Sequence, residues 1–401
     1  MSTRFLPTAA AAMAIALLTA CGHDATAPAV VRSSSTVAAV AAPPVALEWQ
    51  ETARNLVAAR GMSPLAAARM FAATNMAAMQ AVAALDARTE ATARSGGGYG
   101  PGGRSRYEAR RGAVAGASAK VLAWFVPSAA DALDQLVAEQ GSAGPGGTHP
   151  QFASGVAVGR AAADPILAHV MADGFTAPWT GTIPVGPGLW TTTTLPPAGA
   201  TLGQATPWFV TTGSQFRSAP PPEYLSPAFN ADLAEVLTIR TNLTPAQLAI
   251  ALGWAYGAGT YTPVGFWNEL ASTYVAEGGL DEAAATEVFG LMSAAVFDAL
   301  IVAFEGKYHY WTLRPHQANP AITTAFPVPN YPAYPSGHGS VSGASARVLS
   351  HFFPGRQAEL TALVDEAALS RIYAGIHYRF DMTAARTLAE AVADWVIAHG
   401  S

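Results

Sequence analysis

Cysteine is almost absent from this sequence, because Cys21 is its only one. A single cysteine excludes an intramolecular disulfide and a cysteine cluster for a metal ion. Charged side chains are also scarce, at 12% of 401 residues, and the formal net charge is -5. No basic stripe is present, so the sequence does not predict nucleic-acid binding. Any anion that this protein binds must therefore be held by a local cluster of cations.

Long apolar runs are missing after the N-terminus. The strongest, Val288 to Phe297, is ended by Asp298, and no later run is expected to reach the length of a membrane span. Hydrophobic residues nevertheless make up 51% of the chain. This composition excludes intrinsic disorder and predicts a large core.

The N-terminus has the composition of an export signal. Arg4 precedes a short apolar run, Leu6 to Ala20, whose end before Cys21 is similar to a bacterial lipobox. We expect residues 1–20 to be a cleaved signal peptide of the lipoprotein type and Cys21 to carry a lipid anchor to the membrane. The protein would then be exported to the periplasmic face of a bacterial membrane, and we expect this membrane to be the outer membrane. An ordinary signal peptide with an incidental cysteine is the alternative.

The rest of the chain has mostly helical patterns. Residues 21–45 are rich in Gly, Ala, Thr, Ser and Pro, which is typical of a flexible tether. Strand patterns are scarce over 46–400, so we predict one all-α, multi-helix bundle domain there, with its active-site motifs in 307–381. Thr244 begins one helix with a capping box. Other helices are predicted near 65–85, 107–124, 129–139, 151–172, 281–306, 339–352, 356–372 and 382–398.

One stretch, 174–225, is dense in Pro, Thr, Gly and Trp and is much longer than an ordinary connection. Such a stretch is either a lid or cleft wall, or a packed surface segment.

The first of three motifs runs from Lys307 to Pro315. We expect Pro315 to end the preceding helix and so to present Arg314 at a helix end or in a loop. An Arg fork recognises an oxyanion at two points, and Lys307 adds a compact charge. Surface charges around an aromatic core stripe are the alternative.

The second motif runs from Tyr334 to Ser340. Its Pro and Gly residues predict a tight loop before a helix, and the first amides of that helix, with the Ser336 hydroxyl, are a favourable seat for an anion. His338 would stand at the edge of this seat and could transfer a proton near neutral pH. Taken alone, a His after Gly is usually a capping residue.

The third motif runs from Ser370 to Asp381. Arg371 is a further guanidinium for an anion. His377 and Asp381 are four residues apart, so on a helix they would share a face, and the carboxylate could hold one imidazole nitrogen while the other points at a substrate. A histidine held in this way is a nucleophile or an axial ligand. A surface His–Asp pair is the alternative.

Together the motifs read Lys, six residues, Arg-Pro; then Pro-Ser-Gly-His; then Ser-Arg, five residues, His, three residues, Asp. This order resembles the three-part signature of the type-2 phosphatidic acid phosphatase and vanadium-dependent haloperoxidase superfamily. The resemblance is specific because three weak motifs coincide. The segment Ala374 to Asp381 is similar to the bacterial haloperoxidase-like branch. The sequence departs from that branch at Tyr331, seven residues before His338, where Phe or His is common.

The resemblance implies a helical bundle of the haloperoxidase and acid phosphatase type. It also implies that Lys307, Arg314 and Arg371 bind the equatorial oxygens of a tetrahedral oxyanion. Ser336 and the Gly337 amide would add hydrogen bonds.

The resemblance further implies that His338 is the general acid–base and His377 the nucleophile or vanadium ligand, with Asp381 orienting His377. In a haloperoxidase the cofactor would be vanadate, with hydrogen peroxide and a halide as substrates. An acid phosphatase that cleaves phosphate esters through a phosphohistidine, with no cofactor, is the alternative. A lipoprotein that binds an oxyanion without turnover is a third hypothesis. The sequence carries no signal for an oligomeric state.

Overall fold

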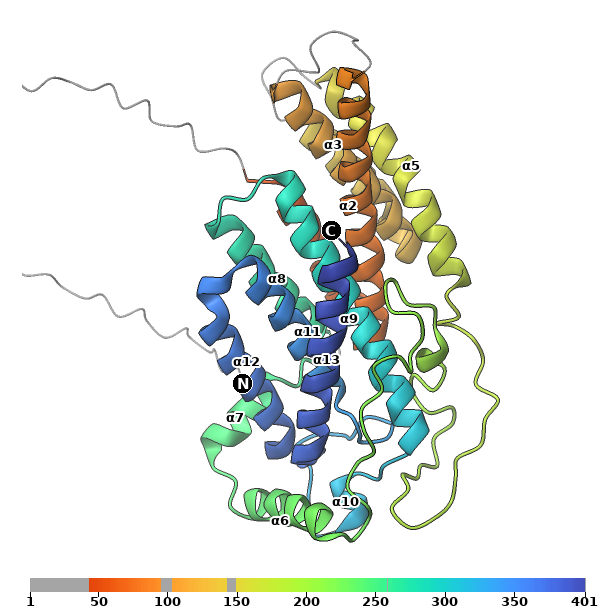
Figure 1. The fold of residues 1–401 in the computed structure, drawn as a ribbon, viewed down its shortest axis with the longest axis vertical. Coiled ribbons are helices and arrows are strands. Elements are labelled where there is room, and N and C mark those ends of the chain that lie inside the picture. The colour runs from red at the N-terminus through yellow and green to blue at the C-terminus, as the bar shows by residue number, and fades with distance from the viewer. Residues whose placement is uncertain (1–42, 95–102, 143–148, 258, 401) are drawn as a thin grey trace, which may run out of the picture. The chain divides into compact units, whose positions relative to one another are not determined.

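The computed structural model describes residues 43–94, 103–142, 149–257 and 259–400. These residues form thirteen α-helices (Figure 1) and include no β-strand, only an isolated bridge between Leu189 and Thr312. The predicted all-α fold is therefore confirmed. The helices are α1 (Val45–Ala59), α2 (Pro64–Arg94), α3 (Gly103–Phe125), α4 (Ala130–Ser142), α5 (Pro150–Ala172), α6 (Pro227–Thr241), α7 (Pro245–Gly253), α8 (Thr262–Glu277), α9 (Glu282–Tyr310), α10 (Pro315–Ala318), α11 (Gly337–Phe352), α12 (Gln357–Tyr373) and α13 (Arg379–Gly400).

The described helices lie in one compact unit, Ala42–Ser401. The predicted signal peptide, Cys21 and the tether up to residue 42 lie outside the described residues. Four helices, α1, α6, α8 and the short α10, are missed by the sequence patterns. In α8, aromatic and β-branched residues lower the intrinsic helix propensity. Its buried Trp267 and Tyr274 compensate by packing against Trp254 and Phe353, which follow α7 and α11.

The helix α9 forms the centre of the bundle. It packs against α2, α11 and α13 (Figure 1), and 22 of its 29 residues are buried. By length and composition α9 could cross a membrane, so the expectation that no later apolar run reaches that length is wrong. However, 94% of the most apolar 18-residue segment of α9 is buried inside the fold, as in the core helix of a bundle.

The irregular stretch 174–225 packs along α9 and is fastened to it by two carboxylates. Asp298 accepts hydrogen bonds from three successive backbone N–H groups, those of residues 208–210, at 2.8, 2.8 and 3.1 Å. Glu305 accepts a hydrogen bond from Arg217 Nε at 2.7 Å. The stretch is therefore held in place although it has almost no regular secondary structure.

Glu282 fastens the start of α1 to the start of α9. Its buried carboxylate accepts hydrogen bonds from the backbone N–H groups of Val45 and Ala46. Burial raises the pKa of Glu282 to about 7, although these hydrogen bonds act in the opposite direction. Because the pKa is higher in the folded than in the unfolded state, this group's stabilising effect is complete below pH 4.5, its unfolded value, and is lost as the pH rises through 7.

We expect the substitution Glu282→Gln to remove this pH dependence. Between about pH 4.5 and pH 7 the shift in wild type corresponds to a loss on the order of 3 kcal/mol in the free energy of unfolding. Denaturant titrations across this range measure the effect, with Glu139→Gln on the exposed face of α4 as the matched control. Equal pH slopes for wild type and Glu282→Gln would contradict the assignment.

Candidate active site

The ends of five helices and the loop after α12 bring the eight predicted site residues together. They occupy these places: Lys307 in the last turn of α9, Arg314 at the N-cap of α10, Ser336 at the N-cap of α11, Gly337 and His338 in its first turn, Arg371 in the last turn of α12, His377 in the loop that follows, and Asp381 in the first turn of α13. All are buried except His338, which is half-buried.

The loop 331–333 orients two of the cations through its carbonyl groups. Lys307 Nζ donates hydrogen bonds to the carbonyl oxygens of Pro332 and Ala333 at 2.9 and 2.8 Å. Arg314 donates from Nε and Nη2 to the carbonyl oxygen of Tyr331 at 3.2 and 3.1 Å. Carbonyl groups fix the direction of these side chains without cancelling their charge.

The end of α9 is set by Trp311, which differs from the expectation. Trp311 adopts the left-handed conformation, with φ 52°, and its N–H donates to the carbonyl of Lys307 at 2.9 Å. This conformation turns the chain out of the helix axis. Pro315 lies beyond that turn and is the first residue of α10, so it does not end α9. Arg314 is presented in the short connection between the two helices.

The C-terminal end of α7 holds two site residues from a part of the chain that carries no motif. His338 Nε2 lies 3.0 Å from the carbonyl oxygen of Trp254, and Arg371 Nη2 donates to the carbonyl of Ala251 at 3.0 Å. A carbonyl can only accept, so Nε2 of His338 carries the proton and Nδ1 carries the lone pair. The capping box at Thr244 predicts where α7 starts, but no sequence signal places its far end.

Ser336 starts α11 as its N-cap. Its Oγ accepts a hydrogen bond from the Gly339 N–H at 3.3 Å, and its carbonyl accepts from the Ser340 N–H at 3.1 Å. The first amides of a helix, here those of Gly337 and His338, have no acceptor within the helix. With the Ser336 hydroxyl as a further donor, they suit the oxygen atoms of an anion.

The imidazole of His377 is held from both sides. Nδ1 lies 2.7 Å from Asp381 Oδ2, which also accepts the Tyr378 N–H at 3.0 Å, and Nε2 lies 3.0 Å from Arg314 Nη1. A guanidinium can only donate, so Nε2 carries the lone pair and Nδ1–H donates to the carboxylate. His377 precedes α13, so the two residues do not share a helix face as expected. Asp381 reaches back from the first turn instead.

A glycine turn places His377. Gly375 has φ 75°, and a Cβ at this position would lie 2.8 Å from the carbonyl oxygen of Thr323, so the turn requires glycine. The next carbonyl, of Ile376, accepts a hydrogen bond from Arg314 Nη1 at 2.7 Å. One turn therefore positions both the imidazole and the guanidinium beside it.

Lys307, Arg314 and Arg371 place three cationic side chains in the interior, each at most 1% exposed. Within the part of the chain that the structure describes, none of them forms an ion pair with a carboxylate. Burial lowers the pKa of Lys307 well below its usual value, and the charge of Arg314 lowers it further. Buried cations without counter-charge are unfavourable, so this cluster is suited to an anion.

The two histidines are kept neutral. Burial lowers the pKa of both well below the usual value, and the nearby arginines lower each pKa further. Burial raises the pKa of Asp381 to about 7, against the opposite effect of Lys307. The site therefore offers two lone pairs beside its cations, on Nδ1 of His338 and on Nε2 of His377.

Tyr331 belongs to the cluster, although its sequence position marks it only as a departure from the related pattern. Its ring centroid lies 4.9 Å from Lys307 Nζ and 5.2 Å from the Arg314 guanidinium carbon. The ring packs against Phe304 at 5.1 Å between centroids. Burial raises the pKa of the phenol, whereas Arg314 and Arg371 lower it. The phenol thus lies among the cations that would bind an anion.

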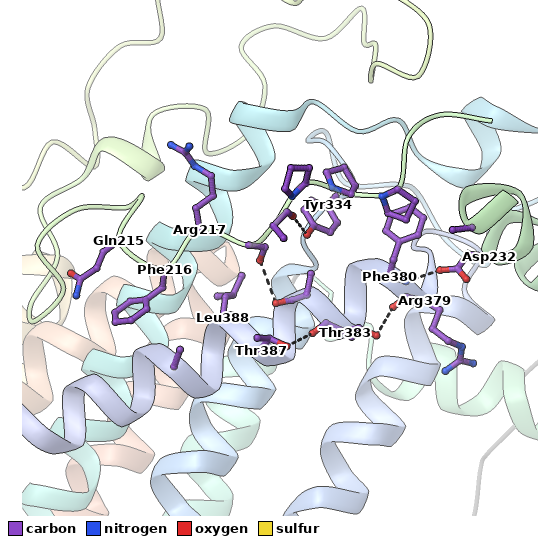
Figure 2. A pocket seen from close by; sticks show the side chains of 18 residues that line it. Gln215, Phe216, Arg217, Asp232, Tyr334, Arg379, Phe380, Thr383, Thr387 and Leu388 are labelled. Atoms are coloured by element: carbon purple, nitrogen blue, oxygen red, sulfur yellow. Dashed lines mark hydrogen bonds between the residues drawn. The ribbon is translucent and has the colours of Figure 1, made fainter. Parts of the chain in front are cut away.

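Two cavities are lined by residues that contact the cluster or are near it in sequence. The larger, of about 780 Å³, lies beside Tyr334 and Phe380, which precede the α11 loop and Asp381 (Figure 2). Charged side chains at its edges include Arg217 and Asp232. The smaller, of about 420 Å³, has Tyr331 in its lining and so reaches the cations through this ring.

The PAP2 superfamily profile matches residues 287–399, a segment that contains all eight predicted site residues. Residues 287–399 belong to the PAP2 superfamily. The chain is also similar to the vanadium chloroperoxidase of Curvularia inaequalis, with 25% identity over 232 residues. That similarity covers 37% of this chain and 38% of the length of the curated relative.

Solved structures give a match over most of the chain. A bacterial vanadium-dependent iodoperoxidase aligns with TM-score 0.71 and 23% identity, covering 88% of this chain and 96% of the other. An apo bacterial vanadium-dependent chloroperoxidase aligns with TM-score 0.66 and 17% identity, covering 82% and 92%. The PAP2 region and the helices before it therefore share the fold of vanadium haloperoxidases, and the superfamily resemblance inferred from the motifs is confirmed.

Proposed function

We propose that this protein is a vanadate-dependent haloperoxidase, which oxidises a halide with hydrogen peroxide. The observation that carries the proposal is the group of three buried cations around the lone pair of His377 Nε2. The described residues contain no cluster of three His, Cys, Asp or Glu side chains suited to a free metal cation. The donors of the pocket instead fit an oxyanion such as vanadate, which the cations would hold together with one nitrogen ligand, His377 Nε2.

In this assignment the cations and the start of α11 bind the oxyanion. Lys307, Arg314 and Arg371 neutralise its oxygens, and Ser336 and the Gly337 N–H donate hydrogen bonds. Negative charge between the cations raises the pKa of Lys307 again and keeps its ammonium charged. Because one lone pair cannot serve two partners, Arg314 Nη1 gives up its contact with His377 when Nε2 becomes a ligand.

The two histidines then have separate tasks. His377 supplies the nitrogen ligand, and Asp381 fixes its tautomer through Nδ1–H. His338 accepts a proton from peroxide at Nδ1, while the Trp254 carbonyl holds its other nitrogen. Bound vanadate supplies the Lewis acid at which peroxide becomes able to oxidise halide. The net reaction consumes one halide, one peroxide and one proton, and it yields hypohalous acid and water.

A phosphatase is the second candidate, because the same lone pair of His377 Nε2 is suited to attack on phosphorus. His338 would then have to protonate the leaving alcohol, which its low pKa disfavours until an anion binds. Similarity to haloperoxidases in sequence and fold favours the first candidate.

One experiment separates these candidates. The purified protein is loaded with orthovanadate and assayed for iodide and bromide oxidation by peroxide, and a vanadate-free sample is assayed for phosphate-ester hydrolysis. We expect halide oxidation that depends on vanadate. Hydrolysis without halide oxidation would make the protein a phosphatase, and vanadate binding without either activity would leave a binding protein.

We further propose that the protein is exported and anchored by a lipid on Cys21 at the periplasmic face of the outer membrane. The signal-like residues 1–20 before the single cysteine support this proposal. Mass spectrometry of the membrane fraction should find a diacylated N-terminal Cys21. Substitution Cys21→Ser should release the protein, and unchanged fractionation would contradict the anchor.

A further inference from the structure

The smaller cavity is built around Tyr331 and is separate from the anion seat. Besides Tyr331, its lining comes from the start of α2 and from two segments of the irregular stretch, residues 175–179 and 196–202. Its volume of about 420 Å³ falls in the range of small-molecule pockets, roughly 300–1,000 Å³. None of the described residues that line it is charged, whereas the larger cavity has Arg217, Asp232 and Arg379 in its lining.

Hydrogen bonds hold the wall of this cavity to Asn330, which precedes the loop 331–333, and to Tyr308 in the last turn of α9. Asn330 Nδ2 donates to the carbonyl of Thr194 at 3.0 Å, and the Asn330 carbonyl accepts the Ala198 N–H at 2.8 Å. Tyr308 OH donates to the Ala198 carbonyl at 2.7 Å. Both Asn330 and Tyr308 are next in sequence to residues of the cation cluster, so the position of the wall is tied to the catalytic groups.

Close packing also fixes the wall. Gly199 has φ 67°, and a Cβ there would lie 2.6 Å from the ring of Phe304, which itself packs against Tyr331. Trp179 is held over Gly181, where a Cβ would lie 2.7 Å from the indole nitrogen. The cavity therefore has an indole packed close to the backbone of Gly181.

The chemistry of the lining selects a flat, neutral ligand. Trp179 and several proline rings offer apolar faces on which an aromatic ring can stack, and none of the lining residues carries a charge that could hold an ionic group. At the inner end, Tyr331 separates such a ligand from the place where hypohalous acid would form. A ligand that stacks here and meets electrophilic halogen must be rich in electrons to react.

We propose that this cavity binds the organic acceptor of the enzyme and that the acceptor is a neutral, electron-rich arene such as a phenol or an indole. The proposal rests on the haloperoxidase function proposed above. In the step it assigns, a ring carbon forms a bond to the halogen of hypohalous acid as the halogen–oxygen bond breaks. The ring then loses a proton, and the products are the aryl halide and water.

The probe for this site is 2-naphthol. Without peroxide it can only bind, and with peroxide and bromide it can be halogenated. Its dissociation constant for the vanadate-loaded protein is measured by calorimetry in the absence of peroxide, and its KM by bromination in the presence of peroxide and bromide. We expect Ala200→Trp, which fills the cavity, and Trp179→Ala, which removes the stacking face, each to raise both constants at least about tenfold. Oxidation of iodide without naphthol should stay within about twofold of wild type.

Trp124→Ala, on an exposed tryptophan that is not part of the cavity lining, is the matched control. Unchanged naphthol binding and KM in both cavity variants would overturn the proposal, even when iodide oxidation is intact. Equal loss of iodide oxidation and naphthol halogenation, with binding unchanged, would also overturn it. Absence of halide oxidation in wild type would refute the proposed function instead, and naphthol binding would then still report whether the cavity takes an arene.

Discussion

Replacing His377 by alanine is expected to abolish peroxide-dependent halide oxidation and to weaken vanadate binding about a hundredfold or more. The substitution removes the Nε2 lone pair and leaves Asp381 buried without its partner, while Lys307, Arg314 and Arg371 remain. Loss of a ligand or nucleophile that acts only in the reaction typically costs about a thousandfold or more in kcat. Calorimetric titration with orthovanadate and initial rates of iodide oxidation measure the two effects.

The control for this experiment is His309→Ala, since His309 lies in the first motif, in the last turn of α9, but is exposed. Circular dichroism of both variants establishes that the helices are retained. Wild-type vanadate affinity in His377→Ala would refute the assigned ligand. Lost activity in His309→Ala would show that the loss in His377→Ala is not specific to the imidazole of His377.

Two substitutions of Asp381 are expected to differ from one another. Asp381→Ala leaves Nδ1–H of His377 without its acceptor and frees the ring to change its tautomer, so we expect vanadate affinity to fall about 10- to 100-fold. Asp381→Asn can place its amide oxygen where Oδ2 lies and keep the hydrogen bonds from His377 and Tyr378. It removes only the negative charge, and we expect a loss of less than about tenfold.

Vanadate titrations of both variants, with kcat for iodide oxidation beside them, measure the difference. Equal losses in Asp381→Ala and Asp381→Asn would mean that the charge of Asp381, and not its hydrogen bond, controls the site. No loss in either variant would remove Asp381 from the catalytic group.

The sequence predicts which side chains form the site better than it predicts the surroundings of those side chains. Lys307, Arg314 and Arg371 could be found because cations are rare in this chain and three of them fall in recognisable motifs. Their burial and mutual proximity could not be found, because they depend on where five separate helices end. The same is true of the role of Tyr331, whose carbonyl and ring both face the cations.

Local geometry is the part that sequence patterns misjudge. The spacing of His377 and Asp381 suggests a shared helix face, but the left-handed turn at Gly375 delays the start of α13 until residue 379. The proline after Arg314 suggests a helix stop, but Trp311 ends the helix earlier. Each error concerns a residue with positive φ, and such residues are set by the packing around them as much as by their type.

The carbonyl oxygens of Ala251 and Trp254 have a consequence for the boundaries of this enzyme. They orient Arg371 and His338, yet they lie outside the PAP2 region of residues 287–399. The PAP2 region thus contains all eight predicted site residues, but it lacks two of the carbonyl groups that orient them. It cannot be moved into another scaffold, or trimmed to its own limits, as a self-sufficient catalytic unit.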